Sequence, residues 1–201
     1  MKFSTRELVT LAVFGALWGL SEISLGSVFH AIDLPKTGLL LSTIGVMIAC
    51  IGRLFVSRRG STLFIGVIAM VLKLFSIGNV IIGPMVGIIA EAIVAELILD
   101  AFRKPTLLAF IVTCAGGALW VFVHPFVTGL LLWGQSLVMV WLDMLDEGSR
   151  LFGIPTQAVY WIVLAVIILH LVLGIVGGWV AWKLGAVLKV RLGGNVPESV
   201  G

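Results

Sequence analysis

Uninterrupted apolar runs dominate this chain, and several of them approach or exceed the length of a membrane-crossing helix. Residues 39–51, for example, include no charged side chain. A helix needs about 20 apolar residues to cross roughly 30 Å of hydrocarbon. Only 11% of the 201 residues are charged and 60% are hydrophobic, whereas a soluble domain carries about 25% charged residues. We therefore expect lipid to surround most of the chain.

The form of these runs favours helices over a transmembrane β-barrel. A barrel would show segments of about ten residues with alternating polarity, and the runs are continuous instead. A helix satisfies its backbone hydrogen bonds within the segment, as lipid requires. The fold class expected is all-α: a polytopic membrane helix bundle with six transmembrane helices.

Breaks between the runs define a single six-helix membrane domain over residues 1–192. The capping-box spacing of Ser4 and Glu7 predicts the start of the first helix, and Arg58, Arg59 and Gly60 close the second. Residues 132–155 are expected to form an amphipathic segment at the interface, with a seventh span there as the alternative, and residues 193–201 a disordered tail. The spans expected are about 5–29, 37–55, 62–76, 80–102, 106–131 and 157–182.

Basic residues are distributed unevenly between the two sides of this six-span arrangement. Ten of the 13 fall on the side that holds both chain ends, and three fall on the other: Lys36, Lys73 and Arg150. The positive-inside rule then predicts cytoplasmic termini in a bacterial-type plasma membrane. The basic residues are scattered at the ends of apolar runs, so the formal charge of +3 does not indicate a nucleic-acid partner.

Ionisable side chains inside the apolar runs require an explanation, because each costs about 2.5–3.5 kcal/mol near the bilayer centre. Glu91 lies about 16 Å into the fourth span, and we expect it to face a polar cavity or a ligand; the alternative is a structural carboxyl, protonated or paired with another helix. Glu22 and Lys73 lie near the outer surface, where they either snorkel or form a pair that shapes a pocket. Structural roles are expected for Glu96 and Asp100 at the inner end.

Trp120 and His124 are four residues apart and therefore share a helix face. An indole beside an imidazole suits a flat heteroaromatic ligand, because one ring stacks and the other forms hydrogen bonds. The alternative is a structural tryptophan next to a satisfied histidine. His170 stands alone in the last span, where a hydrogen bond between helices is the simpler explanation.

Small residues four apart mark faces on which helices approach closely. Gly15 and Gly19 form such a pair in the first span, and Gly174 and Gly178 form one in the last. We expect both pairs to pack inside the bundle.

The sequence contains no recognisable catalytic or metal-binding motif. P-loop, HExxH and GxSxG patterns are absent. Cys50 and Cys114 fall in apolar segments and have neither a disulfide framework nor metal-ligand spacing. We expect no catalytic residues, no metal and no cofactor.

Taken together, these features resemble the substrate-binding S component of energy-coupling-factor (ECF) transporters, the vitamin-importing branch of the ATP-binding-cassette systems. The resemblance rests on the size, on six predicted spans with both ends inside, and on Ala12-x-x-x-Ala16 in the first span. It is clearest over residues 5–102 and includes two further stretches, Arg59-Gly60 through Leu72-Lys73-Leu74 and Gly83-Pro84 to Glu91.

In that family the AxxxA face of the first helix docks on a transmembrane coupling protein, which implies this role for Ala12 and Ala16. The family's pocket opens outward. The similarity implies that six residues lie near it: Asn79, Glu91, Trp120, His124, Gln135 and Tyr160.

The function implied is substrate capture: the chain would bind a small water-soluble vitamin or precursor from outside and hand it to the coupling protein and two separate ATPase subunits. The chain itself would not be an enzyme, and its substrate stays open. One alternative is a membrane-embedded enzyme that uses Glu22, Lys73 and Glu91. Another is a structural membrane subunit without a ligand, in which helix contacts occupy Glu91 and His170.

Overall fold

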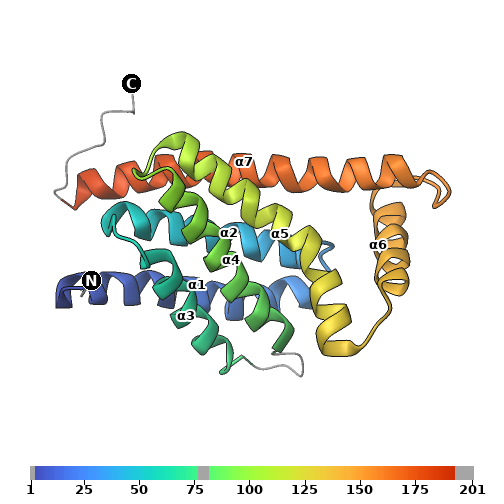
Figure 1. Cartoon of the computed structure of the whole chain (residues 1–201), viewed down its shortest axis with the longest axis horizontal. Helices are drawn as coiled ribbons and strands as arrows, with labels where there is room; N and C mark the ends of the chain where they lie inside the picture. Colours follow the sequence, from blue (N-terminus) through green and yellow to red (C-terminus); the bar gives the residue numbers. More distant parts are fainter. Residues whose placement is uncertain (1–2, 77–81, 193–201) are drawn as a thin grey trace.

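The computed structural model describes residues 3–76 and 82–192, and these form seven helices (Figure 1). The second helix runs through the middle of the bundle and contacts five others. The helices are α1 (Thr5–Ala31), α2 (Thr37–Phe55), α3 (Ser61–Lys73), α4 (Ile82–Ala101), α5 (Leu107–Trp133), α6 (Leu137–Phe152) and α7 (Val159–Arg191).

Five of these helices, α1, α2, α4, α5 and α7, are long and apolar enough to cross a membrane. This confirms the prediction of a multi-pass helical membrane protein. The remaining apolar helix, α3, has 13 residues and is therefore about 20 Å long. It is shorter than the roughly 30 Å hydrocarbon core.

The helix bounds follow the sequence breaks closely, with one clear exception. α2 has the predicted bounds, and α6 lies within the stretch predicted to be interfacial. The last span was predicted to end at about Trp182, and the helix α7 continues beyond that point to Arg191. Residues 183–191 contain no helix breaker except Gly185, and the first glycine pair follows at Gly193 and Gly194. The predicted tail, 193–201, lies outside the described residues.

Local capping explains where several helices begin. Ser4 and Glu7 form the predicted capping box, because the Ser4 N–H donates to Glu7 Oε2 at 2.7 Å and the Glu7 N–H donates to Ser4 Oγ at 3.3 Å. Thr106 and Ser136 accept similar bonds at the starts of α5 and α6. Each cap satisfies an N–H group that the helix itself leaves free.

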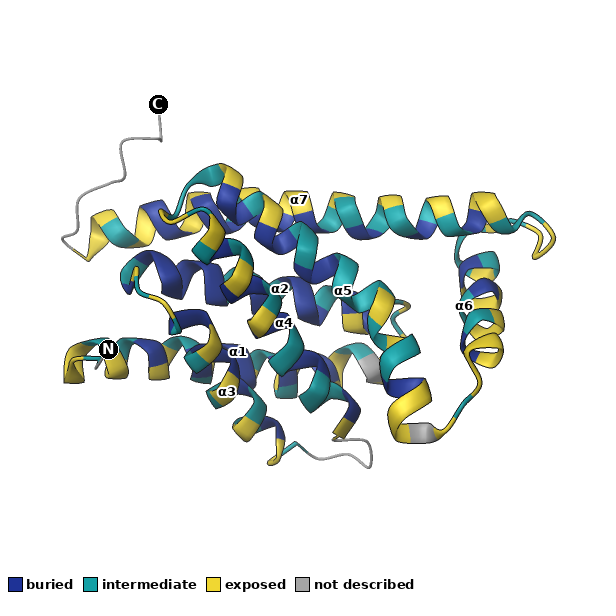
Figure 2. Cartoon of the chain, in the orientation of Figure 1, coloured by how far each residue is buried: buried dark blue, intermediate teal, exposed yellow. Residues whose placement is uncertain are grey.

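The hydrophobic core surrounds α2, which is the most enclosed helix (Figure 2). One cluster joins it to α4, α5 and α7, and includes an edge contact between Phe110 and Trp182 with ring centroids 5.2 Å apart. A second cluster joins it to α1, α3 and α4 around Trp18 and Ile65. By contrast, the outward faces of α1 and α7 expose many large apolar side chains, as expected for surfaces in lipid.

The paired glycines pack inside the bundle, as predicted. A Cβ atom on Gly174 would lie 2.5 Å from the Cα of Ala115, and one on Gly178 would lie 2.5 Å from the Cα of Ile111. These two glycines therefore bring α7 against the backbone of α5. Gly15 and Gly19 likewise let α1 pack closely against α3, because Cβ atoms added to them would lie 2.6 Å and 2.8 Å from side-chain atoms of α3.

A buried ion cluster ties α2, α3 and α4 together at one end of the bundle. Glu96 accepts hydrogen bonds from Arg53 Nη1 at 2.9 Å and from three backbone N–H groups at the start of α3: Gly60 at 2.6 Å, Thr62 at 2.9 Å and Leu63 at 3.3 Å. The Thr62 hydroxyl donates to it as well. Asp100 pairs with Arg53 and with Arg59. The structural roles predicted for Glu96 and Asp100 are confirmed.

The start of α1 and the end of α7 lie at the same end of the bundle (Figure 1). α6 lies at the opposite end, where it runs crosswise to α7 and packs against α5 and α7. Its exposed apolar side chains include Leu137, Val138, Met139 and Leu142. This placement agrees with the amphipathic segment predicted for this part of the chain.

Candidate ligand-binding site

Two adjoining cavities lie at the α6 end of the bundle. The α6 cavity has a volume of about 830 Å³, and the α4 cavity has one of about 920 Å³. Both fall in the range of small-molecule sites, roughly 300–1,000 Å³. Their shared wall consists of Thr37, Gly38, Val121, His124 and Thr128.

The chain topology explains why residues far apart in sequence meet here. Apart from α6 and the α1–α2 turn, the linings use the second halves of α1 and α5, the first halves of α2, α4 and α7, and the end of α3. Because successive helices run in opposite directions, these segments all lie at the end away from the start of α1 and the finish of α7 (Figure 1).

Two carboxyl groups and one ammonium group gather in the α4 cavity, one each from α1, α3 and α4, beside the imidazole of His124. Lys73 Nζ lies 3.6 Å from Glu22 Oε2 and donates to the backbone carbonyl of Glu22 at 3.4 Å. Glu91 lines the same cavity. All three residues are at most 8% exposed. Glu22 and Lys73 therefore form the pair that the sequence left as one of two possibilities, and the pair helps to shape a pocket.

Glu91 presents the clearest unsatisfied group in this cavity. It is 6% exposed, and its Oε2 atom accepts no hydrogen bond from the described residues. The hydroxyl of Ser42, another lining residue, also lacks a hydrogen-bond partner among them. A buried polar group without a partner costs about 1–3 kcal/mol, and more if it is charged. A bound molecule with hydrogen-bond donors would remove this cost.

His124 stands in the wall between the two cavities. Its Nε2 lies 3.2 Å from the carbonyl oxygen of Gly83. Since a carbonyl only accepts, Nε2 carries the proton in this contact, and a neutral ring then leaves Nδ1 as an acceptor. Gly87 makes room for the ring, because a Cβ atom there would lie 3.3 Å from Nε2.

Pro125 adds an acceptor to the same wall. Proline has no N–H, so Pro125 cannot donate the usual helix hydrogen bond to the carbonyl of Val121. Pro125 lines the α6 cavity, and Val121 lines both cavities. The helix continues through this position.

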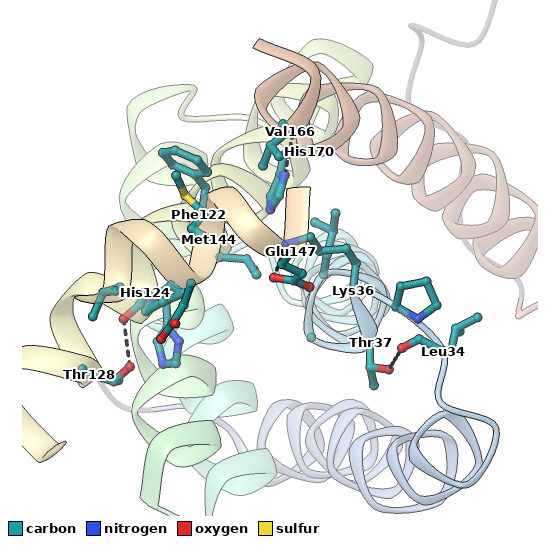
Figure 3. Close-up of a pocket in the computed structure, with 18 of the residues that line it drawn as sticks. Leu34, Lys36, Thr37, Phe122, His124, Thr128, Met144, Glu147, Val166 and His170 are labelled. Atoms are coloured by element: carbon teal, nitrogen blue, oxygen red, sulfur yellow. Dashed lines mark hydrogen bonds and ion pairs between the residues drawn. The ribbon is translucent and has the colours of Figure 1, made fainter. Parts of the chain in front are cut away.

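An ion pair spans the α6 cavity between the α1–α2 turn and α6 (Figure 3). Lys36 Nζ lies 2.7 Å from Glu147 Oε2, and the two side chains are 16% and 51% exposed. Asp143 lies one turn before Glu147 on α6 and lines the cavity with it. His170 of α7 also faces the cavity, and its Nδ1 lies 2.7 Å from the carbonyl of Val166 in its own helix. The interhelical hydrogen bond expected for His170 is therefore replaced by one within α7.

We expect Lys36→Met to loosen α6 without unfolding the bundle. The ion pair is half exposed, so its loss should cost at most about 1 kcal/mol and raise amide hydrogen exchange in α6 by up to about fivefold. Exchange followed by mass spectrometry checks this. Arg150→Met is the control, because its partner Asp146 belongs to the same helix. Equal exchange rates in the two variants would contradict a fastening role for Lys36.

Only some of the six residues predicted to bind substrate line the two cavities in the described part of the chain. Glu91, His124 and Gln135 line the cavities. Trp120 lies edge-on to His124 with ring centroids 6.2 Å apart, but it is not part of either lining. Tyr160 is 90% exposed and lies outside both linings. Asn79 lies outside the described residues.

Sequence reasoning did not assign several lining residues to the site. Lys36, Asp143, Glu147 and His170 all line the α6 cavity. The spacing of Asp143 and Glu147, four apart on an amphipathic helix, is a usable signal for a shared face. The partner of Glu147 is 111 residues away, and no local pattern indicates that contact.

The two alanines predicted for docking lie near the start of α1. Ala12 is exposed and Ala16 is half-buried. The neighbouring Gly15 and Gly19 face α3 instead. The AxxxA face is thus left partly uncovered within the chain.

No protein-family model, curated protein or solved structure matches this chain. The geometry of the two cavities is therefore the basis for a functional assignment.

Proposed function

We propose that this chain is the substrate-capture membrane subunit of an ECF-type importer. It binds a small water-soluble vitamin or precursor from outside the cell in the adjoining cavities. The observation that carries the proposal is Glu91, a buried carboxyl whose Oε2 has no hydrogen-bond donor among the described residues although it lines a cavity of about 920 Å³. A polar neighbour of Glu91 on another helix is the Ser42 hydroxyl of α2, which does not reach hydrogen-bond geometry, whereas Glu96 accepts from Arg53 at 2.9 Å.

The proposal assigns energy coupling to other proteins. The exposed position of Ala12 and the half-buried position of Ala16 support docking of a transmembrane coupling protein on α1, since small residues let another helix approach closely. Two separate ATPase subunits would drive release of the captured molecule. This chain has no P-loop of its own.

We further propose that six helices cross a bacterial-type plasma membrane and that both termini are cytoplasmic. α3 is the sixth span, and its shortness suits a helix that ends at a binding cavity. With this orientation ten of the 13 basic residues lie inside, and the cavities lie at the outer end. Trp161 of α7, 66% exposed, then joins the outer aromatic belt.

A membrane-impermeant maleimide tests this orientation in intact cells. Gln135→Cys, in the α6 cavity, should be labelled from outside, whereas Lys183→Cys, exposed near the other end of α7, should react only after permeabilisation. The native Cys50 and Cys114 are fully buried and give little background. The reverse labelling pattern would show that the cavities face the cytoplasm.

Ligand binding tests the capture function itself. Purified protein is titrated with cationic, neutral and anionic water-soluble micronutrients while its tryptophan fluorescence is followed, with Trp120 near the shared wall as a reporter. We expect one compound to bind, and Glu91→Ala to weaken it by at least about tenfold. Tyr160→Ala is the control and should leave affinity unchanged. If none of the compounds binds, the capture function is wrong and a structural subunit is favoured.

A membrane-embedded enzyme is the second candidate, because Glu22, Lys73 and Glu91 share one cavity. Such a carboxylate–ammonium cluster is suited to proton transfer. In that case Glu91→Gln would retain binding of the compound but abolish its conversion. Chemically unchanged compound recovered from the native protein favours capture instead.

A further inference from the structure

The cavities are acidic although the chain is basic. The whole chain has a formal charge of +3. Among the described residues, two ammonium groups belong to the linings, those of Lys36 and Lys73. Half of the chain's ten acidic residues line the two cavities: Glu22, Asp33, Glu91, Asp143 and Glu147.

This concentration of carboxylates has a direct electrostatic consequence. Counted as ionised, the five carboxyl groups and two ammonium groups give the linings a formal charge of −3. A cleft lined by one sign of charge between low-dielectric walls concentrates ions of the opposite sign. Both ammonium groups are already paired, Lys36 with Glu147 and Lys73 with Glu22. They are therefore not free to bind an anion.

The unsatisfied groups in the walls are mainly acceptors, and the Ser42 hydroxyl, which can also donate, is the exception. Glu91 Oε2 lacks a donor among the described residues, and the Val121 carbonyl lacks its helix donor because position 125 is proline. His124 uses Nε2 toward Gly83, which leaves Nδ1 as an acceptor in the neutral ring. A matching molecule must supply hydrogen-bond donors, and the N–H groups of a cation are the strongest donors to a carboxylate.

From these observations we propose that the cavities select a small organic cation, an amine or amidine whose N–H groups donate to Glu91. A metal ion does not fit, because the described residues contain no cluster of three or more His, Cys, Asp or Glu side chains that could hold one. The inference rests on the proposed capture function and specifies its substrate class. Hydrogen bonds between an N–H cation and a carboxylate are roughly twice as strong as neutral ones.

Four probes of nearly equal size separate charge from hydrogen bonding. Benzamidine carries a positive charge and N–H donors, phenyltrimethylammonium carries the charge alone, benzamide is neutral, and benzoate is anionic. Binding to the purified full chain is measured by isothermal titration calorimetry. We expect benzamidine to bind at least about tenfold tighter than each of the other three.

Two variants test which carboxylate causes the preference for benzamidine over benzamide. Glu91→Gln removes the charge with little change of shape and should abolish the advantage of benzamidine over benzamide. Asp146→Asn removes an exposed carboxylate outside the linings and should leave that advantage intact. Benzamidine that fails to bind, or that binds no better than benzamide or benzoate, overturns the cation class. A benzamidine preference unchanged in Glu91→Gln overturns the role of Glu91.

The micronutrient titration distinguishes this failure from failure of the proposed function. If an anionic or neutral micronutrient binds and no cationic one does, the cation class is overturned and the capture function still stands. If no micronutrient of any charge binds, the capture function itself is overturned.

Discussion

Replacement of Glu96 by alanine is expected to destabilise the bundle by about 3–5 kcal/mol, the usual cost of removing one partner from a buried ion pair. The carboxylate holds the guanidinium of Arg53, which is 6% exposed, and three N–H groups at the start of α3. Its loss leaves a buried positive charge whose one remaining counter-ion among the described residues is Asp100. It also leaves the N-terminus of α3 without a cap, which adds about 1 kcal/mol.

Unfolding in mixed detergent micelles measures this effect. Asp146→Ala is the matched control, because Asp146 forms an exposed pair with Arg150, and such pairs contribute about 0–1 kcal/mol. Glu96→Gln should fall between the two, since its single amide oxygen can still accept from the backbone. If Glu96→Ala is no less stable than Asp146→Ala, the cluster does not fasten α3 to α4.

Replacement of Gly178 by leucine is the second large effect expected. An added Cβ would lie 2.5 Å from the Cα of Ile111 and 2.6 Å from the carbonyl oxygen of Phe110. Both are backbone atoms of a packed helix and cannot rotate away. We expect α5 and α7 to separate, with a loss of about 3 kcal/mol or more in the free energy of unfolding.

The same variant should weaken ligand capture, because α5 and α7 both line the α6 cavity. Gly38→Ala is the control for unfolding: a Cβ atom there would meet nothing within 4 Å, and alanine is the better helix former. The explanation would be wrong if Gly178→Leu retained native stability. Fluorescence-detected unfolding of the three proteins in one detergent makes the comparison.

Local sequence patterns were sufficient for most of the helices. Charged residues and glycines predicted the bounds of α2, and the capping box predicted the start of α1. The small-residue pairs indicated which faces of α1 and α7 pack tightly. These features depend on residues within one or two turns of each other. The predicted last span ends at Trp182 because Lys183 indicates a membrane boundary, while helix propensity allows the helix α7 itself to continue.

The site was harder to predict, because contacts between distant helices create it. Glu91 stood out as a carboxyl in an apolar run, and Glu22 and Lys73 were recognised as a possible pair. The link from Lys36 to Glu147 joins residues 111 positions apart, and the contact of Arg53 with Glu96 joins residues 43 apart. Tyr160 was chosen because the resemblance places the pocket among the outer loops and outer helix ends, and that location does not determine which way a side chain faces on a helix.

The acidic character of the cavities shows the same limitation. Total charge describes the average surface, and here that average is positive. The lining is acidic because the fold brings Asp33, Asp143 and Glu147 to one cavity and Glu22 and Glu91 to the other. Only the topology of the bundle determines this grouping.

Mass spectrometry of small molecules released from gently purified protein tests the central claim of capture most directly. The native chain and Tyr160→Ala should each release one vitamin-sized compound in stoichiometric amount, and the Glu91→Ala, His124→Ala double variant should release none while remaining folded. The same amount released from all three proteins, or none from the native chain, would contradict the assignment of these cavities as the capture site.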